Sequence, residues 1–168
     1  MPGYVIHLAI GKIYEKNNYI KDIESFEKGI IAPDLTTNKP MTHYGPYSSR
    51  PGLNRYLNEH GIKCEFDEGY FLHLVSDYLF YNKFLKTWDK SIYEDYDILN
   101  DRIVEEYNIV IPKEIEYAIH PKTGKLNILN IEDIEKFIKV IGNINYREII
   151  KQKNIDREKE FHKTEFEI

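Results

Sequence analysis

Apolar residues recur along most of this chain at the three- and four-residue spacing that is typical of helices. The first segment is apolar on nearly all sides, which indicates a buried helix. The second ends before Pro33, because the residue preceding a proline is disfavoured in the helical conformation. We expect helices over residues 2–17, 20–31, 52–59, 67–88, 91–107, 112–119, 131–141 and 146–153. The pattern therefore predicts an all-α fold, with a single compact multi-helix domain over residues 1–168.

Two stretches lack a helical pattern. Residues 33–52 carry four of the seven prolines, and a loop of that length inside a domain is usually functional or disordered. Residues 154–168 form a charged tail that is expected to fray. No strand signal is strong, although residues 107–111 and 126–129 could pair briefly.

The composition is that of a globular protein, and it narrows the function. The 168 residues carry a formal net charge of -5, which disfavours electrostatic binding to nucleic acid. Cys64 is the single cysteine, so disulfides and cysteine-based zinc sites are excluded within one chain. The first residues do not follow a signal-peptide pattern, and no run approaches the ~20 apolar residues of a membrane span. We therefore expect a cytoplasmic protein in which any metal ion is bound by His, Asp and Glu.

The most apolar of the predicted helices contains a histidine and an aspartate four residues apart, His73 and Asp77. This spacing places both side chains on one face of a helix. The helix is apolar on every side, so the pair is expected to be buried, where an unpaired carboxylate is costly. Two interpretations are open. Either His73 donates a hydrogen bond to Asp77 in a satisfied core pair, or both residues bind one metal ion.

Three further residues could complete such a metal site. His7 lies in the apolar first helix near Gly11, which would allow a second helix to approach closely. Asp34 follows a rigid proline, and His43 precedes a glycine-containing turn. Each also has an ordinary explanation, as a core histidine bonded to a carbonyl, a turn-forming aspartate and a surface histidine. The other histidines are expected to be exposed and without a role: His60, His120 and His162.

Taken in order, these motifs resemble the zinc-dependent phospholipase C family, whose all-helical fold is shared with zinc-dependent single-strand nucleases. The resemblance rests on His7, Gly-Ile-Ile-Ala-Pro-Asp34, His43-Tyr-Gly and His73-Leu-Val-Ser-Asp77, and it covers residues 4–81. It implies that one zinc ion is bound by Asp34, His43, His73 and Asp77. It also implies that His7 binds a second zinc ion, with Asp77 bridging the two.

Beyond residue 81 the chain departs from the family's pattern. The family binds a third zinc ion through two more histidines and a glutamate. Here Lys83 stands where a histidine is expected, and Asp97 and Asp101 stand in place of a His-x-x-x-Glu pair. Their neighbours Glu94, Asp95 and Glu105 favour a solvated helix face. We therefore expect one or two zinc ions rather than three.

The resemblance implies a hydrolase that cleaves a small phosphoester, in the first instance a phosphodiester, with metal-activated water. Asp34 is the residue expected to orient or deprotonate that water, and Tyr44, Tyr47 and Tyr81 could line a substrate cleft or could simply pack. Two alternatives remain open. One is a phosphohydrolase of the His-Asp class, although no His-Asp dipeptide occurs in the chain. The other is a non-catalytic helical module that is stabilised by a metal or binds a ligand.

Overall fold

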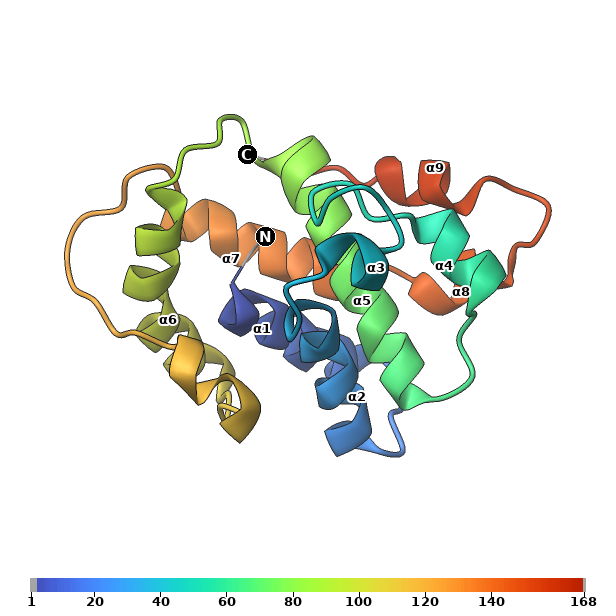
Figure 1. Cartoon of the computed structure of the whole chain (residues 1–168), viewed down its shortest axis with the longest axis horizontal. Helices are drawn as coiled ribbons and strands as arrows, with labels where there is room; N and C mark the ends of the chain where they lie inside the picture. The colour runs from blue at the N-terminus through green and yellow to red at the C-terminus, as the bar shows by residue number, and fades with distance from the viewer. Residues whose placement is uncertain (1–2, 168) are drawn as a thin grey trace.

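A computed structural model describes residues 3–167, and the regular elements among them are all helices or helical turns (Figure 1). The expected all-α class is confirmed. None of the described helices is long and apolar enough to cross a membrane. The elements are α1 (Tyr4–Asn17), α2 (Ile23–Ile31), η1 (Ala32–Asp34), α3 (Lys39–His43), α4 (Leu53–Glu59), α5 (Glu65–Leu79), η2 (Phe80–Phe84), α6 (Ile92–Tyr107), η3 (Lys113–Ala118), α7 (Ile131–Gly142), α8 (Tyr146–Lys151) and α9 (Arg157–His162).

Helix α1 lies in the middle of the fold and contacts α2, α5, α6 and α7 (Figure 1). Its side chains Val5, Ile6, Ala9 and Ile10 are fully or almost fully buried. Burial on all sides is what its continuous apolar sequence predicts, since no face of such a helix is suited to water. The surrounding helices cover this central helix with their apolar faces, so the buried apolar side chains form one cluster.

Helices α2 and α5 cross in close backbone contact because each carries a glycine at the crossing. A Cβ atom on Gly29 would collide with the carbonyl oxygen of Phe66, and one on Gly69 would collide with the carbonyl oxygen of Phe26. Neither oxygen can move aside easily, since both belong to the backbone of a helix. The crossing brings the end of α2 beside the middle of α5, where the candidate site forms.

Helix α5 is shorter than its sequence pattern predicts. It ends at Leu79, and the π-helical turn η2 follows before the chain becomes extended. The continuous helix expected over residues 67–88 is therefore wrong in its last part. The wider turn lets Phe80 and Phe84 pack against one ring, that of Phe137 in α7, with ring centroids 5.4 Å and 4.8 Å away.

The segment expected to be one long loop, residues 33–52, is interrupted by regular structure. The turn η1 continues α2 as far as Asp34, and α3 begins after Asn38, whose side chain caps the helix. Helix α3 ends at His43, and the following Tyr44 adopts the left-handed conformation with φ 56°. These two elements hold Asp34 and His43 in defined positions.

Two other expectations fail for identifiable reasons. Residues 107–111 and 126–129 do not pair as strands within the described chain, because the backbone N–H groups of residues 127–129 donate to the Asp95 carboxylate instead. The tail is also not frayed throughout. Helix α9 buries Phe161 completely, and the ring packs against Tyr146, so this part of the tail is anchored to the core.

Candidate metal centre

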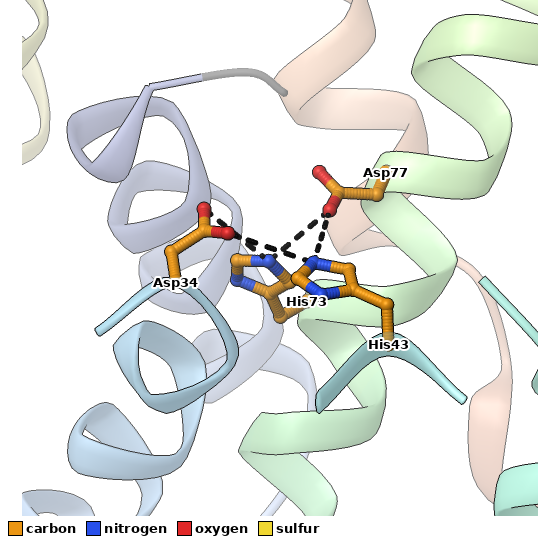
Figure 2. Close-up of side chains that lie close together, drawn as sticks. All are labelled: Asp34, His43, His73 and Asp77. Carbon is orange, nitrogen blue, oxygen red and sulfur yellow. Dashed lines mark hydrogen bonds and ion pairs between the residues drawn. The ribbon is translucent and has the colours of Figure 1, made fainter. Parts of the chain in front are cut away.

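Four buried side chains from three elements meet at one point: Asp34 from η1, His43 from the end of α3, and His73 and Asp77 from α5 (Figure 2). Each contributes one nitrogen or oxygen atom, and these atoms all lie within 4.8 Å of one another. The side chains have no exposed surface. The fold thus brings together four of the five residues that the sequence motifs singled out.

The two carboxylates lie on opposite sides of the two imidazole rings (Figure 2). Asp77 Oδ2 is 3.0 Å from His43 Nε2 and 3.2 Å from His73 Nε2. The oxygens of Asp34 are 3.5 Å from the same two nitrogens, Oδ1 from His43 and Oδ2 from His73. Both rings therefore present the same atom, Nε2, to the carboxylates.

Backbone carbonyls determine which ring nitrogens face the cluster. The Nδ1–H of His73 donates to the carbonyl oxygen of Ile30, 2.7 Å away, and the Nδ1–H of His43 donates to that of Lys39, 3.1 Å away. Because Nδ1 carries a proton in each ring, Nε2 of the neutral ring has only a lone pair. A lone pair that faces a carboxylate needs a positive charge between them, which a proton or a metal cation can supply. This hydrogen-bonding pattern is typical of histidines that bind metal ions.

The shifts in pKa have the same origin. Burial lowers the pKa of His73, but the neighbouring Asp77 and Asp34 outweigh it, and the net shift is upward. Burial raises the pKa of Asp77, but His73 and the hydrogen bonds from the imidazoles outweigh it and hold that pKa well below its ordinary value. The cluster is therefore an environment that stabilises positive charge.

Several polar atoms at this point have no hydrogen-bond partner among the described residues. They are Asp34 Oδ2, His73 Nε2, Asp77 Oδ1 and both ring nitrogens of His7. Buried polar atoms are nearly always paired, so a group of unpaired ones in one place indicates a missing ligand. Imidazole nitrogens and carboxylate oxygens are donors for a divalent metal ion. The residues fit such an ion.

His7 lies beside this group but is not one of the four. Its ring stacks on that of His73, with centroids 3.8 Å apart, and its Nε2 is 3.2 Å from Asp77 Oδ1. Burial, and then the charge on His73, lower the pKa of His7 to about 4. Its ring is thus neutral at physiological pH, as a metal ligand must be. The nearby Gly11 leaves room for the side chain of Ile30 in α2, in line with the close helix approach that the sequence predicts.

Lys39 is the site residue that the sequence did not reveal. Its Nζ donates to Asp34 at two points, 3.0 Å from Oδ1 and 2.9 Å from the backbone oxygen. The hydroxyl of Tyr4 donates to that same backbone oxygen, at 2.8 Å. These contacts restrain Asp34 through Oδ1 and leave Oδ2 unpaired toward the cluster. Nothing in the sequence singled out Lys39, because residues 33–52 were expected to form a loop.

The downstream residues considered for a third zinc ion do not belong to this group. Within the described chain neither Asp97 nor Asp101 joins it. Lys83 donates instead to the carbonyl oxygens of His162 and Thr164, so it ties η2 to the tail.

Asp95 corrects a different expectation. It was expected on a solvated face of α6, but it is completely buried. Its carboxylate accepts hydrogen bonds from the backbone N–H groups of residues 127–129 and from the side chain of Asn127. The available signal was its position four residues before Leu99, within the apolar stripe of the helix. A buried carboxylate satisfied by four donors serves the fold rather than a metal ion.

Two of the remaining histidines are exposed as expected, His120 and His162. His60 is only partly exposed, and its Nε2 lies 2.9 Å from Asp67 Oδ1. The backbone N–H of Lys63 donates to the other oxygen, at 3.0 Å. Burial raises the pKa of Asp67, but these hydrogen bonds outweigh it and the net shift is downward. His60 therefore has a structural role at the start of α5.

This pair predicts a pH effect on stability. The pKa of Asp67 is lower in the folded chain than in the unfolded chain, so its carboxylate stabilises the fold above about pH 4. The contribution is lost as the pH falls through the folded-state value. Urea unfolding should show that Asp67→Asn narrows the difference in free energy of unfolding between about pH 6 and about pH 3. Asp101→Asn, on an exposed position, should leave that difference unchanged, and an equal narrowing there would contradict the assignment.

The cluster has a defined chemical capacity. It presents two imidazole nitrogens and two carboxylates to one point, with a third imidazole and a lysine beside them. Such a donor set can bind a divalent cation, and it contains no thiolate.

Searches with protein-family models, against curated proteins and against solved structures found no match to this chain.

Proposed function

We propose that this chain is a zinc-dependent hydrolase of phosphoesters, with phosphodiesters as its first class of substrate. The observation that carries the proposal is the donor set, which consists of histidine and aspartate without cysteine. Structural zinc sites are built largely from cysteine, whereas catalytic zinc sites use histidine and carboxylate ligands. The resemblance of the ordered motifs to zinc-dependent phospholipase C supports the same function.

The residues divide into two groups around Asp77. One ion would be held by Asp34, His43, His73 and Asp77, whose donor atoms lie within 4.8 Å of one another. His7 would help to hold a second, because it approaches the other oxygen of Asp77. Zinc bound there would lower the pKa of a water molecule toward neutrality and polarise a phosphoryl oxygen.

The side chains of this protein supply the remaining parts of the reaction. Asp34 would accept the proton of the attacking water through Oδ2, the oxygen that Lys39 leaves unpaired. Lys39 adds a positive charge at the edge of the cluster, which would offset negative charge on a phosphoryl group. The carbonyls of Ile30 and Lys39 hold the imidazoles in one orientation, so that the ligand atoms need not rearrange.

A second function is favoured by one observation, the complete burial of the four side chains. A metal ion whose ligands are all enclosed, with no position open to substrate, stabilises a fold without catalysing a reaction. This is the non-catalytic, metal-stabilised module. The two functions differ in one respect that can be measured. The hydrolase requires that substrate and water reach the ion, and the module requires that they do not.

The test combines metal content with turnover. Purified protein loaded with zinc is expected to hold one or two ions per chain and to hydrolyse bis(4-nitrophenyl) phosphate until a chelator is added. Asp34→Asn should lower the turnover number on the order of a hundredfold or more, since a positioned base contributes at least that much. The exposed Asp101→Asn serves as the control. Bound zinc without turnover on phosphodiesters or phosphomonoesters would favour the module, and no bound zinc would refute both functions.

A further inference from the structure

A pocket of about 500 Å³ lies at the surface next to the elements that carry the cluster. It is lined by the loop that follows α3, by η2, by the segment that leads into α6 and by the first turn of α6. Its residues are Ser48, Ser49, Arg50, Tyr81, Asn82, Trp88 and Tyr93. Tyr81, one of the tyrosines that the sequence placed at a possible cleft, is thus on its wall. A volume of this size suits a small organic ligand.

The pocket is connected to the cluster through both of its walls. One wall is the loop that starts directly after His43 and crosses the end of α5 (Figure 1). The other continues α5, and its Tyr81 lies one helical turn beyond Asp77, a rise of about 6 Å. Asn82 Nδ2 donates to the carbonyl oxygen of Ser49, 3.0 Å away, and so joins the two walls. The two walls of the pocket thus belong to the same stretches of chain as His43 and Asp77, although neither of these residues lines it.

The pocket carries positive charge in a chain that is negative overall. Arg50 is exposed, and among the described residues it forms no salt bridge with a carboxylate. No acidic residue lines the pocket, although the chain has a net charge of -5. A guanidinium group without a partner binds phosphate or carboxylate through paired hydrogen bonds. The hydroxyls of Ser48 and Ser49 add donors beside it.

Aromatic side chains also line the pocket. Trp88 is 56% exposed and Tyr93 is 48% exposed, so solvent reaches both rings. Rings and an arginine in one pocket offer a stacking surface for a planar group that also carries negative charge. An aliphatic ligand would not use the rings in this way.

We propose that this pocket binds the ring of an aromatic phosphoester, with the ring on Trp88 and Tyr93 and its anionic group on Arg50. The inference rests on the proposed function for the statement that the ligand is a substrate. The aromatic and basic character of the pocket does not depend on that function. The same chemistry would admit an aromatic carboxylate, and the experiment distinguishes the two.

Trp88 is the only tryptophan in the chain, so its fluorescence reports directly on this pocket. Zinc-free and zinc-loaded protein would be titrated with phenyl phosphate, benzoate, phenol and inorganic phosphate. We expect phenyl phosphate to change the fluorescence saturably in both forms, with a Kd about tenfold lower than that of phenol or inorganic phosphate. A Kd for benzoate equal to that for phenyl phosphate would assign the site to aromatic anions in general and overturn the substrate assignment.

Two arginine variants make the test specific. Arg50→Gln should raise the Kd of phenyl phosphate about tenfold, the usual effect of losing a charge-assisted hydrogen bond. Arg55→Gln is the matched control, because Arg55 lies on the next helix and pairs with Glu59 instead. Equal binding by wild type and Arg50→Gln would overturn the proposal, as would binding that disappears with chelator. The expected binding does not require zinc, so the binding measurement can still be interpreted if the protein proves not to be a hydrolase.

Discussion

Asp77→Asn is expected to weaken zinc binding by more than about a hundredfold, because even residues that only orient a metal ligand contribute 10- to 100-fold. Asp77 is the one side chain in contact with three imidazoles, through Oδ2 to His43 and His73 and through Oδ1 to His7. Asparagine keeps the shape of the side chain but removes its charge. Competition with a chelating dye would measure the affinity, and elemental analysis would measure the content.

The control is the same substitution at the other end of the same helix. Asp67→Asn changes a nearly buried carboxylate that pairs with His60 and lies outside the cluster. It should retain the full zinc content. Circular dichroism of each variant would verify that the helices are intact. If Asp77→Asn and His73→Ala both bind zinc like the wild type, this cluster is not a metal site.

Gly69→Ala is expected to lower the free energy of unfolding by about 3 kcal/mol or more, at the upper end of the range for an overpacked core. The added methyl group would meet the carbonyl oxygen of Phe26, so α2 and α5 would have to move apart. Gly29→Ala should act in the same way on the opposite helix. Urea unfolding followed by circular dichroism measures the change.

Gly11→Ala is the matched control for these two variants. Its methyl group would meet the end of the Ile30 side chain, which can rotate away, so the loss of free energy of unfolding should be clearly smaller.

The helix crossing also affects the candidate metal site. Separation of α2 from α5 would draw the Ile30 carbonyl away from His73, so the two crossing variants should also bind zinc more weakly. Gly69→Ala protein with wild-type stability would show that the crossing is not tight.

The helical class and the burial of His73 beside Asp77 are predictable from the sequence for a clear reason, whereas the grouping of Asp34 and His43 with them was implied by the family resemblance. A histidine and an aspartate one turn apart in a helix without a polar face must be buried together, and His73 and Asp77 are. What the sequence could not supply is the partner of each atom. The Ile30 carbonyl that orients His73 is a backbone group, and carbonyls look alike in every sequence. Lys39 was missed because it lies in a segment whose prolines predicted a loop, where a lysine is ordinarily exposed to solvent.

The ends of elements were less predictable, and packing explains why. Apolar residues recur at helical spacing after Leu79, so periodicity alone predicts that the helix continues. In the structure Phe80 and Phe84 both pack against Phe137 of α7, and the backbone there forms a π turn. Asp95 shows the converse case. The acidic residues around it in the sequence suggest a helix face exposed to solvent. In the structure residues 127–129 fold back over the Asp95 carboxylate and bury it. In both cases the deciding contact is distant in sequence.

The origin of the four donors in η1, α3 and α5 has a consequence for the folding of the chain. A cation that binds Asp34, His43, His73 and Asp77 together would act as a reversible cross-link between segments far apart in sequence. The cross-link would close long loops of the chain. The entropy cost of closing a loop rises only slowly with its length. Because such an ion would bind the assembled donors far more tightly than the separate ones, its removal would lower the fraction of the chain in the native state.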